Sequence, residues 1–226
     1  MMELTTTRTI SAEAARSTPL RKRVLDVTLS VLGLILAAPL FVLIPILIKL
    51  DSPGPVFFNR VRIGKDGKPF LMYKFRTMVM DAEARLAELA EHNQGGAYFV
   101  QIPHDPRVTR VGRVLRYASL DELPQLINVL KGEMSLVGPR PQYPSEVALY
   151  TEEQRRRLEV LPGITGLWQL ADREGATFER WVAHDLAYID HWSLVLDLKI
   201  LAYTALRVCT LGHVRPHLRL DRVSLD

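Results

Sequence analysis

The feature that most constrains the fold is an apolar block near the N-terminus. Residues 27–48 read VTLSVLGLILAAPLFVLIPILI and contain no charged side chain. An α-helix rises about 1.5 Å per residue, so this block could cross a hydrocarbon core of about 30 Å. It exceeds the apolar region of a secretory signal peptide, which has roughly 7–15 residues, and no small-residue cleavage site ends it. The sequence therefore predicts a membrane-embedded helix.

Two observations bear on the path of this helix. Both flanks are basic, whereas positive charge normally marks only the cytoplasmic side of a membrane. The flanking basic residues are Arg21, Lys22, Arg23, Lys49, Arg60, Arg62, Lys65 and Lys68. Pro39 lies in the middle of the block, where its missing N–H and fixed φ should kink or break a helix. A helix that bends at Pro39 and leaves by the same face fits both observations, and a single span fits the length.

The rest of the chain predicts a mainly helical α+β fold. Two β-rich segments, Pro55–Ile63 and Pro69–Phe75, flank Asp66-Gly67, which is a strong hairpin-turn signal. Lys131-Gly132 is a typical helix stop. Composition and helical spacing predict helices over residues 81–91, 123–131, 145–161, 178–189 and 192–208.

The segment Trp192–Val208 is apolar on most of its circumference, but Asp197 and Lys199 argue against a second membrane span. It fits an interfacial helix with Trp192 and Tyr203 at the level of the lipid headgroups. A core helix fits equally well.

Composition narrows the partners and the compartment. The formal net charge of +4 favours acidic partners such as phosphates, anionic lipid or nucleic acid. Cys209 is the single cysteine, so an internal disulfide is excluded and a reducing compartment is indicated.

Two adjacent acids, Asp121 and Glu122, follow a run of arginines at three-residue spacing. The stretch Ser119-Leu-Asp-Glu122 predicts a capping box in which Ser119 and Glu122 satisfy each other's backbone. Alternatively, a helix begins at Asp121 and places Pro124 in its first turn. In both cases the helix dipole favours an ionised Asp121 by typically about 0.3–1 kcal/mol.

Carboxylates beside arginines point to phosphate chemistry. A carboxylate can attack phosphorus, or hold Mg²⁺ together with substrate phosphates. Attack by one anion on another requires that the phosphate charge be neutralised, for which arginine is well suited. The candidate cations are Lys74, Arg76, Arg116 and Arg140. The alternative is a solvated or headgroup-facing basic surface, which we expect for Arg107 and Arg110.

These residues lie in stretches that resemble the bacterial sugar transferases, the monotopic phosphoglycosyl transferases that start glycan assembly on polyprenyl phosphate. The long central run is highly specific, and together the matches cover about residues 22–208. The stretches are KRVLD at 22–26, SPGPVFF at 52–58, YKFRTM at 73–78, DPRVTRVGRVLR at 105–116, SLDELPQLINVLKGEMSLVGPRP at 119–141, PGITG at 162–166 and YIDHWSLVLDLKIL at 188–201.

The resemblance implies an activity and a set of site residues. Asp121 matches the family nucleophile and Glu122 its catalytic partner, and both are expected to hold Mg²⁺. The aspartate attacks the β-phosphate of a UDP-sugar, releases UMP and carries a phosphosugar, which polyprenyl phosphate then accepts. Contacts with substrate phosphate or nucleotide are expected for Lys74, Arg76, Arg116, Arg140, Pro141 and Arg173.

The resemblance also implies a membrane arrangement. It favours a re-entrant helix broken at Pro39, with Lys22, Arg23 and Asp26 supporting its geometry at the interface. The expected organisation is a mobile tail at 1–20, a re-entrant helix at 21–50, a cytoplasmic catalytic domain with interfacial helices at 51–208, and a C-terminal tail at 209–226. The expected location is the cytoplasmic face of the bacterial inner membrane. The expected partners are a UDP-sugar, polyprenyl phosphate and inner-membrane lipid, without nucleic acid; a homodimer is left open.

Three positions depart from the family pattern. Arg60 stands where the family usually has Gln, Ala38 where it often has Ser, and Ala171-Asp172 where it often has Asn-Gly.

Two other classes of function compete with the enzyme. A membrane-anchored nucleic-acid-binding protein would bind in a strongly salt-dependent way, and a passive scaffold would have no Mg²⁺-dependent nucleotide chemistry.

Overall fold

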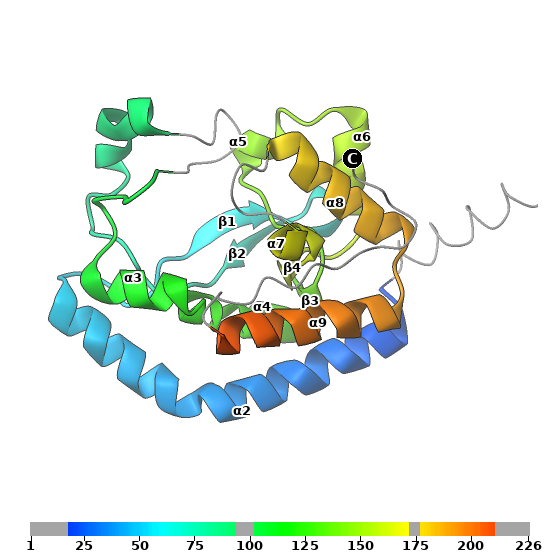
Figure 1. The fold of residues 1–226 in the computed structure, drawn as a ribbon, viewed down its shortest axis with the longest axis horizontal. Helices are drawn as coiled ribbons and strands as arrows, with labels where there is room; N and C mark the ends of the chain where they lie inside the picture. The colour runs from blue at the N-terminus through cyan, green and yellow to red at the C-terminus, as the bar shows by residue number, and fades with distance from the viewer. Residues whose placement is uncertain (1–17, 94–101, 172–176, 211–226) are drawn as a thin grey trace, which may run out of the picture.

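The structure, a computed structural model, describes residues 18–93, 102–171 and 177–210 of the 226-residue chain. Helices dominate and the strands are short (Figure 1), which agrees with the expected α+β class. The α-helices are α2 (Leu20–Asp51), α3 (Arg110–Tyr117), α4 (Gln125–Lys131), α5 (Pro144–Val147), α6 (Glu152–Arg155), α7 (Leu167–Ala171), α8 (Phe178–Asp190) and α9 (Leu194–Cys209). The 3-10 helices are η1 (Lys65–Gly67), η2 (Ala84–His92), η3 (Leu120–Glu122) and η4 (Arg156–Glu159). The strands are β1 (Arg60–Ile63), β2 (Pro69–Met72), β3 (Ser135–Val137) and β4 (Gly163–Thr165).

Helix α2 is one continuous helix that passes through Pro39 and Pro45. The predicted break at Pro39 therefore takes the form of a bend, because one missing N–H and a displaced turn can be absorbed without ending the helix. Figure 1 shows α2 as a bow whose two ends turn toward the rest of the molecule and whose middle lies farthest from it. The re-entrant path through a membrane stays a prediction.

The two faces of α2 differ in burial. The inner face buries Ala37, Ile44 and Ile48. On the outer face Leu36 is 80% exposed and Val42 66% exposed. Among the described residues, α2 is the one helix long and apolar enough to cross a membrane, and only 17% of its most apolar window is buried. The core helix of a soluble protein would be mostly buried, so the exposed apolar face indicates a membrane-bound protein.

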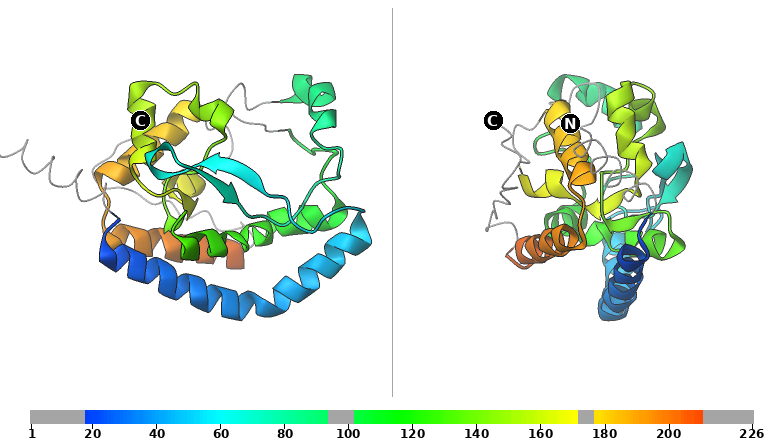
Figure 2. Two further views of the ribbon diagram at one scale, coloured as in Figure 1. Left: turned by 180° about the vertical axis from the view of Figure 1, so that it is seen from behind. Right: turned by 90° about the vertical axis from the view of Figure 1, so that its right-hand side faces the viewer.

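Helices α3, α4 and α9 form the layer next to α2 (Figures 1 and 2). On α9 one face buries Leu196, Asp197 and Ile200, and the other exposes Val195 and Leu198. One face of α9 therefore packs in the core, as expected for a core helix. The exposed apolar face of α9 fits an interfacial helix. On α3 and α4 the exposed apolar side chains are Val114, Tyr117 and Ile127.

Two small sheets lie above this layer. Strands β1 and β2 form the predicted antiparallel hairpin, with Arg60 opposite Met72, although the strands are shorter than expected. Its turn uses left-handed backbone at Asp66 (φ 56°) and Gly67 (φ 73°), as the Asp-Gly signal predicts. Strands β3 and β4 pair in parallel, which the sequence did not predict.

The parallel pair depends on a close approach between two backbones. A Cβ atom at Gly163 would lie 2.1 Å from the backbone nitrogen of Gly138, so a side chain at this position would force the strands apart. The contact brings the PGITG loop against the loop that carries Arg140. Both loops contribute to the site described below.

Two apolar clusters hold the layers together. The larger lies between β2, α4, β3 and helices α7, α8 and α9, and includes Met72, Val129 and Ile200. The smaller consists of Ile44, Ile48, Phe75 and Leu115 and attaches the second half of α2 to the domain.

Several local predictions are confirmed, and one predicted helix is wrong. Helix α4 ends before Gly132 (φ 80°), and α8 spans the expected segment. Residues 81–91 are helical in part, as the 3-10 helix η2. A single helix over residues 145–161 is wrong, because Thr151 starts a new helix. Its hydroxyl accepts a bond from Gln154 N (3.3 Å), and Gln154 Oε1 accepts one from Thr151 N (2.9 Å). The predicted tails lie largely outside the described residues.

Candidate active site

Asp121 and Glu122 lie in the 3-10 turn η3, between α3 and α4. The predicted capping box is wrong, because Ser119 adopts left-handed backbone (φ 56°) and its side chain makes no cap hydrogen bond. Helix α4 starts at Gln125, after Pro124, so the alternative start at Asp121 is also wrong. Phe75 N donates to the Asp121 carbonyl (3.0 Å), which ties this turn to the segment after β2.

Lys74 connects the two acids. Its Nζ lies 2.9 Å from Glu122 Oε1 and 3.4 Å from Asp121 Oδ2. Burial raises the pKa of Asp121; Lys74 and Arg116 oppose this, and the neighbouring Glu122 adds to it. Lys74 therefore helps to keep a buried carboxylate ionised.

A pocket opens beside this cluster. Four of the residues that sequence analysis selected line it together: Lys74, Glu122, Arg140 and Pro141. The other lining residues are Met72, Gln125, Gly163 and Ile164. The fold thus brings one hairpin strand, the acidic turn, the start of α4, the loop after β3 and strand β4 to one place.

The buried ion pair between Arg157 and Asp185 contacts the backbone of Arg140. Its guanidinium carbon lies 5.0 Å from the centre of the Trp168 ring. Its carbonyl accepts a hydrogen bond from Arg157 Nη2 (3.4 Å), and the same nitrogen lies 2.6 Å from Asp185 Oδ2. Burial raises the pKa of Asp185 to about 6, although Arg157 opposes the shift. The backbone of Arg140 is therefore supported by α8 and η4, in addition to the prolines on either side of it.

Two other predicted cations lie outside the pocket lining. Arg116 Nε donates to Thr77 Oγ1 (2.8 Å), and its charge acts on Asp121 as described above. Arg76 is buried and donates to the carbonyls of Ser52 (2.8 Å) and Pro53, just after α2. The structure thus gives Arg76 a role in holding the end of the membrane helix.

Arg107 corrects one expectation about the arginine run. It is buried, lies 2.7 Å from Asp105 Oδ2 and donates to the carbonyl of Ala82 (3.0 Å), so it is not a surface residue. Arg110 is exposed, as expected. Arg173 and Asp172 lie outside the described residues.

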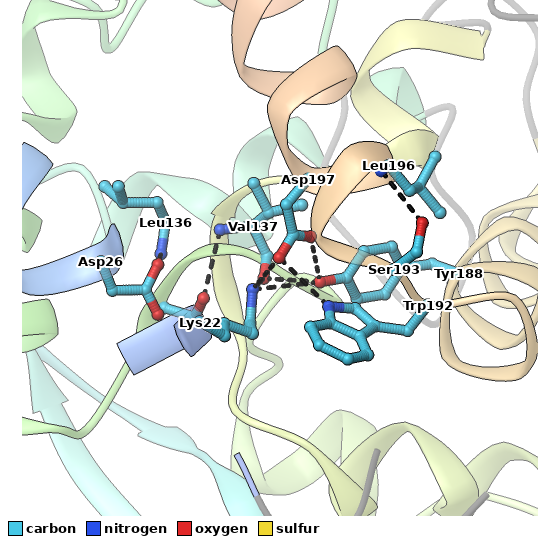
Figure 3. A network of polar contacts seen from close by, with 10 residues as sticks. Lys22, Asp26, Leu136, Val137, Tyr188, Trp192, Ser193, Leu196 and Asp197 are labelled. Atoms are coloured by element: carbon cyan, nitrogen blue, oxygen red, sulfur yellow. Dashed lines mark hydrogen bonds and ion pairs between the residues drawn. The ribbon is translucent and has the colours of Figure 1, made fainter. Parts of the chain in front are cut away.

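Three residues of the KRVLD motif, Lys22, Arg23 and Asp26, fix the start of α2 to the domain, and Figure 3 shows the contacts of Lys22 and Asp26. Lys22 Nζ lies 2.8 Å from Asp197 Oδ2 and donates to Val137 O (3.0 Å) and Tyr188 Oη (3.2 Å). Asp26 Oδ1 accepts a bond from Leu136 N (3.0 Å). Arg23 donates to the carbonyls of Val129 and Leu130 at the end of α4.

Sequence reasoning missed two polar residues on α4. Asn128 is fully buried; its Oδ1 accepts from Tyr73 N (3.0 Å) and its Nδ2 donates to Leu71 O (2.8 Å). It therefore fixes the backbone next to Lys74. Gln125 is buried in the pocket wall. Their spacing in the sequence could have indicated them, because residues 125 and 128 share a helix face outside the apolar stripe.

The residues present fit the magnesium ion that the resemblance implies. No group of three or more His, Cys, Asp or Glu side chains that could hold a metal occurs in the described parts of the chain. Mg²⁺ commonly takes only one or two carboxylates and completes its shell with water and substrate phosphates. Asp121 and Glu122 supply such a pair, so their role as metal ligands stays a prediction that the donor chemistry supports.

Comparison with known proteins identifies the family. The family model described as "Bacterial sugar transferase" matches residues 17–211. The chain belongs to this family. The match includes the acidic turn, the pocket and α2, so the resemblance found in the sequence is confirmed.

The protein is similar to relatives of different lengths. It is 43% identical over 192 residues to "Galactosyl transferase CpsE" of Streptococcus agalactiae, covering 84% of this chain and 42% of that protein. It is 43% identical over 193 residues to "Exopolysaccharide production protein ExoY" of Sinorhizobium fredii, covering 83% and 85%. It is 45% identical over 193 residues to "UDP-glucose:undecaprenyl-phosphate glucose-1-phosphate transferase" of Caulobacter vibrioides, covering 82% and 68%.

Proposed function

We propose that this bacterial sugar transferase moves a sugar-1-phosphate from a UDP-sugar to polyprenyl phosphate and releases UMP. The name of the Caulobacter relative describes this reaction for glucose and undecaprenyl phosphate. The observation that carries the proposal is the position of Lys74, which contacts both Asp121 and Glu122 at the edge of a pocket that Arg140 also lines. Such a site pairs a buried carboxylate with the cations that a diphosphate requires.

The proposed reaction has two displacements at one phosphorus atom. First, an oxygen of Asp121 forms a bond to the β-phosphorus, and the bond from that phosphorus to the bridging oxygen breaks. UMP leaves with the bonding electron pair. Second, a phosphate oxygen of polyprenyl phosphate attacks the same phosphorus and frees the Asp121 carboxylate, which gives polyprenyl diphosphosugar. Aspartate is a known covalent nucleophile of this kind in phosphoryl transfer.

The surrounding residues have separate tasks in this proposal. Lys74 and Arg140 reduce the negative charge of the diphosphate, and Arg116 contributes from the side of α3. Glu122 assists Asp121 through metal or proton handling. Mg²⁺, when held by these carboxylates, adds positive charge next to the diphosphate.

The proposal places the enzyme on the cytoplasmic face of the bacterial inner membrane, with α2 re-entrant. The exposed apolar outer face of α2 supports embedding in lipid. The basic residues on both flanks support exit on the side of entry. Polyprenyl phosphate would then reach the pocket from the bilayer while the soluble UDP-sugar arrives from the cytoplasm.

The direct test replaces Asp121 by Asn, which keeps the size of the side chain and removes the nucleophile. With Mg²⁺, polyprenyl phosphate and a panel of UDP-sugars, the wild type is expected to release UMP and Asp121→Asn is expected to lose this activity. Substantial UMP release by the variant would contradict the proposal. Nucleic-acid binding that is salt-dependent and insensitive to Asp121 would favour the competing class instead.

A further inference from the structure

Gln125 is a buried amide whose donor has no partner. Its side chain is 3% exposed, and Nε2 makes no hydrogen bond within the described part of the chain. The same side chain lines the pocket beside Lys74, Glu122 and Arg140. A buried amide nitrogen without an acceptor loses its hydration without compensation, so this arrangement costs stability.

Another buried glutamine of the same chain shows the usual arrangement. Gln169 is 9% exposed, and its Nε2 donates to the carbonyl of Ile164 (3.1 Å). Nearby on α4, Asn128 bonds through both ends of its amide. These two buried amides are paired. Asn59 Oδ1 is another buried amide atom without a partner in the described part of the chain, but it is an acceptor and Asn59 does not line the pocket, whereas the unpaired donor of Gln125 does.

We propose that Gln125 is a substrate-contacting residue, whose Nε2 donates a hydrogen bond to an oxygen of the transferred phosphosugar. The inference rests on the proposed function. Gln125 begins the helix that follows the acidic turn, and it shares the pocket with Lys74, which bonds to both acids. The acceptor oxygens closest to Asp121 during the reaction belong to the phosphoryl group under attack and its sugar. A neutral donor at this point adds a directed hydrogen bond without adding charge.

The test uses two replacements of similar length. Gln125→Met removes the donor and leaves an apolar side chain, and Gln125→Glu replaces the donor by an acceptor. Both are measured by UMP release over a range of UDP-sugar concentrations. Binding of UMP to the free protein is measured separately by calorimetry, and thermal unfolding is followed in parallel. Gln169→Met serves as the matched stability control.

Loss of a hydrogen bond to a charged or strongly polar group should lower kcat/KM for the UDP-sugar about 10–100-fold in Gln125→Met. We expect a larger loss in Gln125→Glu, where a carboxylate would face the phosphoryl oxygens. The dissociation constant of UMP from the free protein should stay within about twofold of wild type, because UMP lacks the transferred group. The Tm of Gln125→Met should equal or exceed that of wild type, whereas Gln169→Met should lose stability.

Three results would overturn the inference. In the first, kcat/KM of Gln125→Met stays within about twofold of wild type. In the second, binding of UMP to the free protein weakens in parallel with the loss of kcat/KM, which would assign the contact to the nucleotide. In the third, Gln125→Met loses as much thermal stability as Gln169→Met, which would make Gln125 structural. If the wild type releases no UMP from any UDP-sugar, the proposed function itself fails and the inference fails with it. Activity that depends on Asp121 but not on Gln125 would reject the inference alone.

Discussion

Two lysines of this protein lie beside carboxylates, and their surroundings differ. The Nζ of Lys22 has three acceptors, Asp197, Val137 O and Tyr188 Oη, and its side chain is 8% exposed. Asp197 in turn accepts bonds from Tyr188 Oη (2.7 Å) and Trp192 Nε1 (3.1 Å). Lys74 contacts two acids, is 20% exposed and faces a pocket. Similar residues thus form an anchor where protein groups satisfy the charges and a candidate reaction site where the cluster opens to a ligand.

The two clusters are joined by a short stretch of backbone. Val137 ends β3, and its carbonyl accepts a bond from Lys22 and lies 3.1 Å from Tyr188 Oη, whose one hydrogen is donated to the closer Asp197. The loop of Gly138–Pro141, which carries Arg140 into the pocket wall, follows directly. The anchor therefore fixes the membrane helix and the strand that leads into the site with the same hydrogen bonds.

The largest effect on stability is expected from Lys22→Met. Removing one partner of a buried ion pair leaves Asp197 buried with an uncompensated charge, which typically costs about 3–5 kcal/mol. Thermal or denaturant unfolding in detergent would measure the loss. The neighbouring Arg21→Met is the control, because Arg21 carries the same charge and is exposed. Its guanidinium carbon lies 5.4 Å from the centre of the Trp192 ring, so a small loss of stability is expected. The double change Lys22→Met with Asp197→Leu should recover part of the stability. A Lys22→Met protein as stable as the Arg21→Met control would contradict the description of this cluster as an anchor.

Lys74→Met should have a large effect on activity and a small effect on stability, the opposite of what is expected for an anchor residue. We expect UMP release to fall about 10²–10³-fold, the range found when one preorganised electrostatic contact is removed from an active site. Stability should change much less than in Lys22→Met, because the cluster is partly open to solvent. Lys68→Met, at the exposed end of the hairpin, is the control and should remain near wild type. An equal loss of stability in the two lysine variants would remove the distinction between the clusters.

The smallest expected effect is a shift in pH dependence. Since burial raises the pKa of Asp121, activity that needs the ionised carboxylate should fall on acidification at a higher pH than for an ordinary aspartate. Lys74 lowers this pKa, so Lys74→Met should move the acidic limb of kcat/KM to higher pH. Glu122 raises it, so the residual activity of Glu122→Gln should have its acidic limb at lower pH. Shifts in the opposite directions would show that another group controls the limb.

Local signals in the sequence predicted much of the fold and part of the site. Asp66-Gly67 gave the hairpin, and Gly132 gave the end of α4. Thr151 and Gln154 have the spacing of a capping box, which signals the start of a new helix. The high charge of residues 145–161 instead favoured the prediction of one long helix. At Ser119 the same type of motif failed because the chain must turn there between α3 and η3, and left-handed backbone prevents the cap. Local patterns thus succeed where no tertiary turn overrides them.

Tertiary packing explains what the sequence could not predict. The parallel pairing of β3 with β4 depends on a close approach at Gly163, which a linear pattern does not reveal. Arg107 looked like one of several equivalent surface arginines, and only the path of the chain places Asp105 and Ala82 around it. Gln125 looked like an ordinary polar helix residue, and its unpaired amide became visible only with the pocket.

The central claim is that Asp121 becomes covalently linked to the phosphosugar before polyprenyl phosphate takes part. Incubation of the active protein with labelled UMP, Mg²⁺ and a UDP-sugar that supports turnover, without lipid acceptor, tests it directly. The account predicts that label enters the UDP-sugar with wild-type protein and does not with Asp121→Asn. Absence of exchange in a preparation that turns over normally with polyprenyl phosphate would contradict the account and indicate direct transfer between the two substrates.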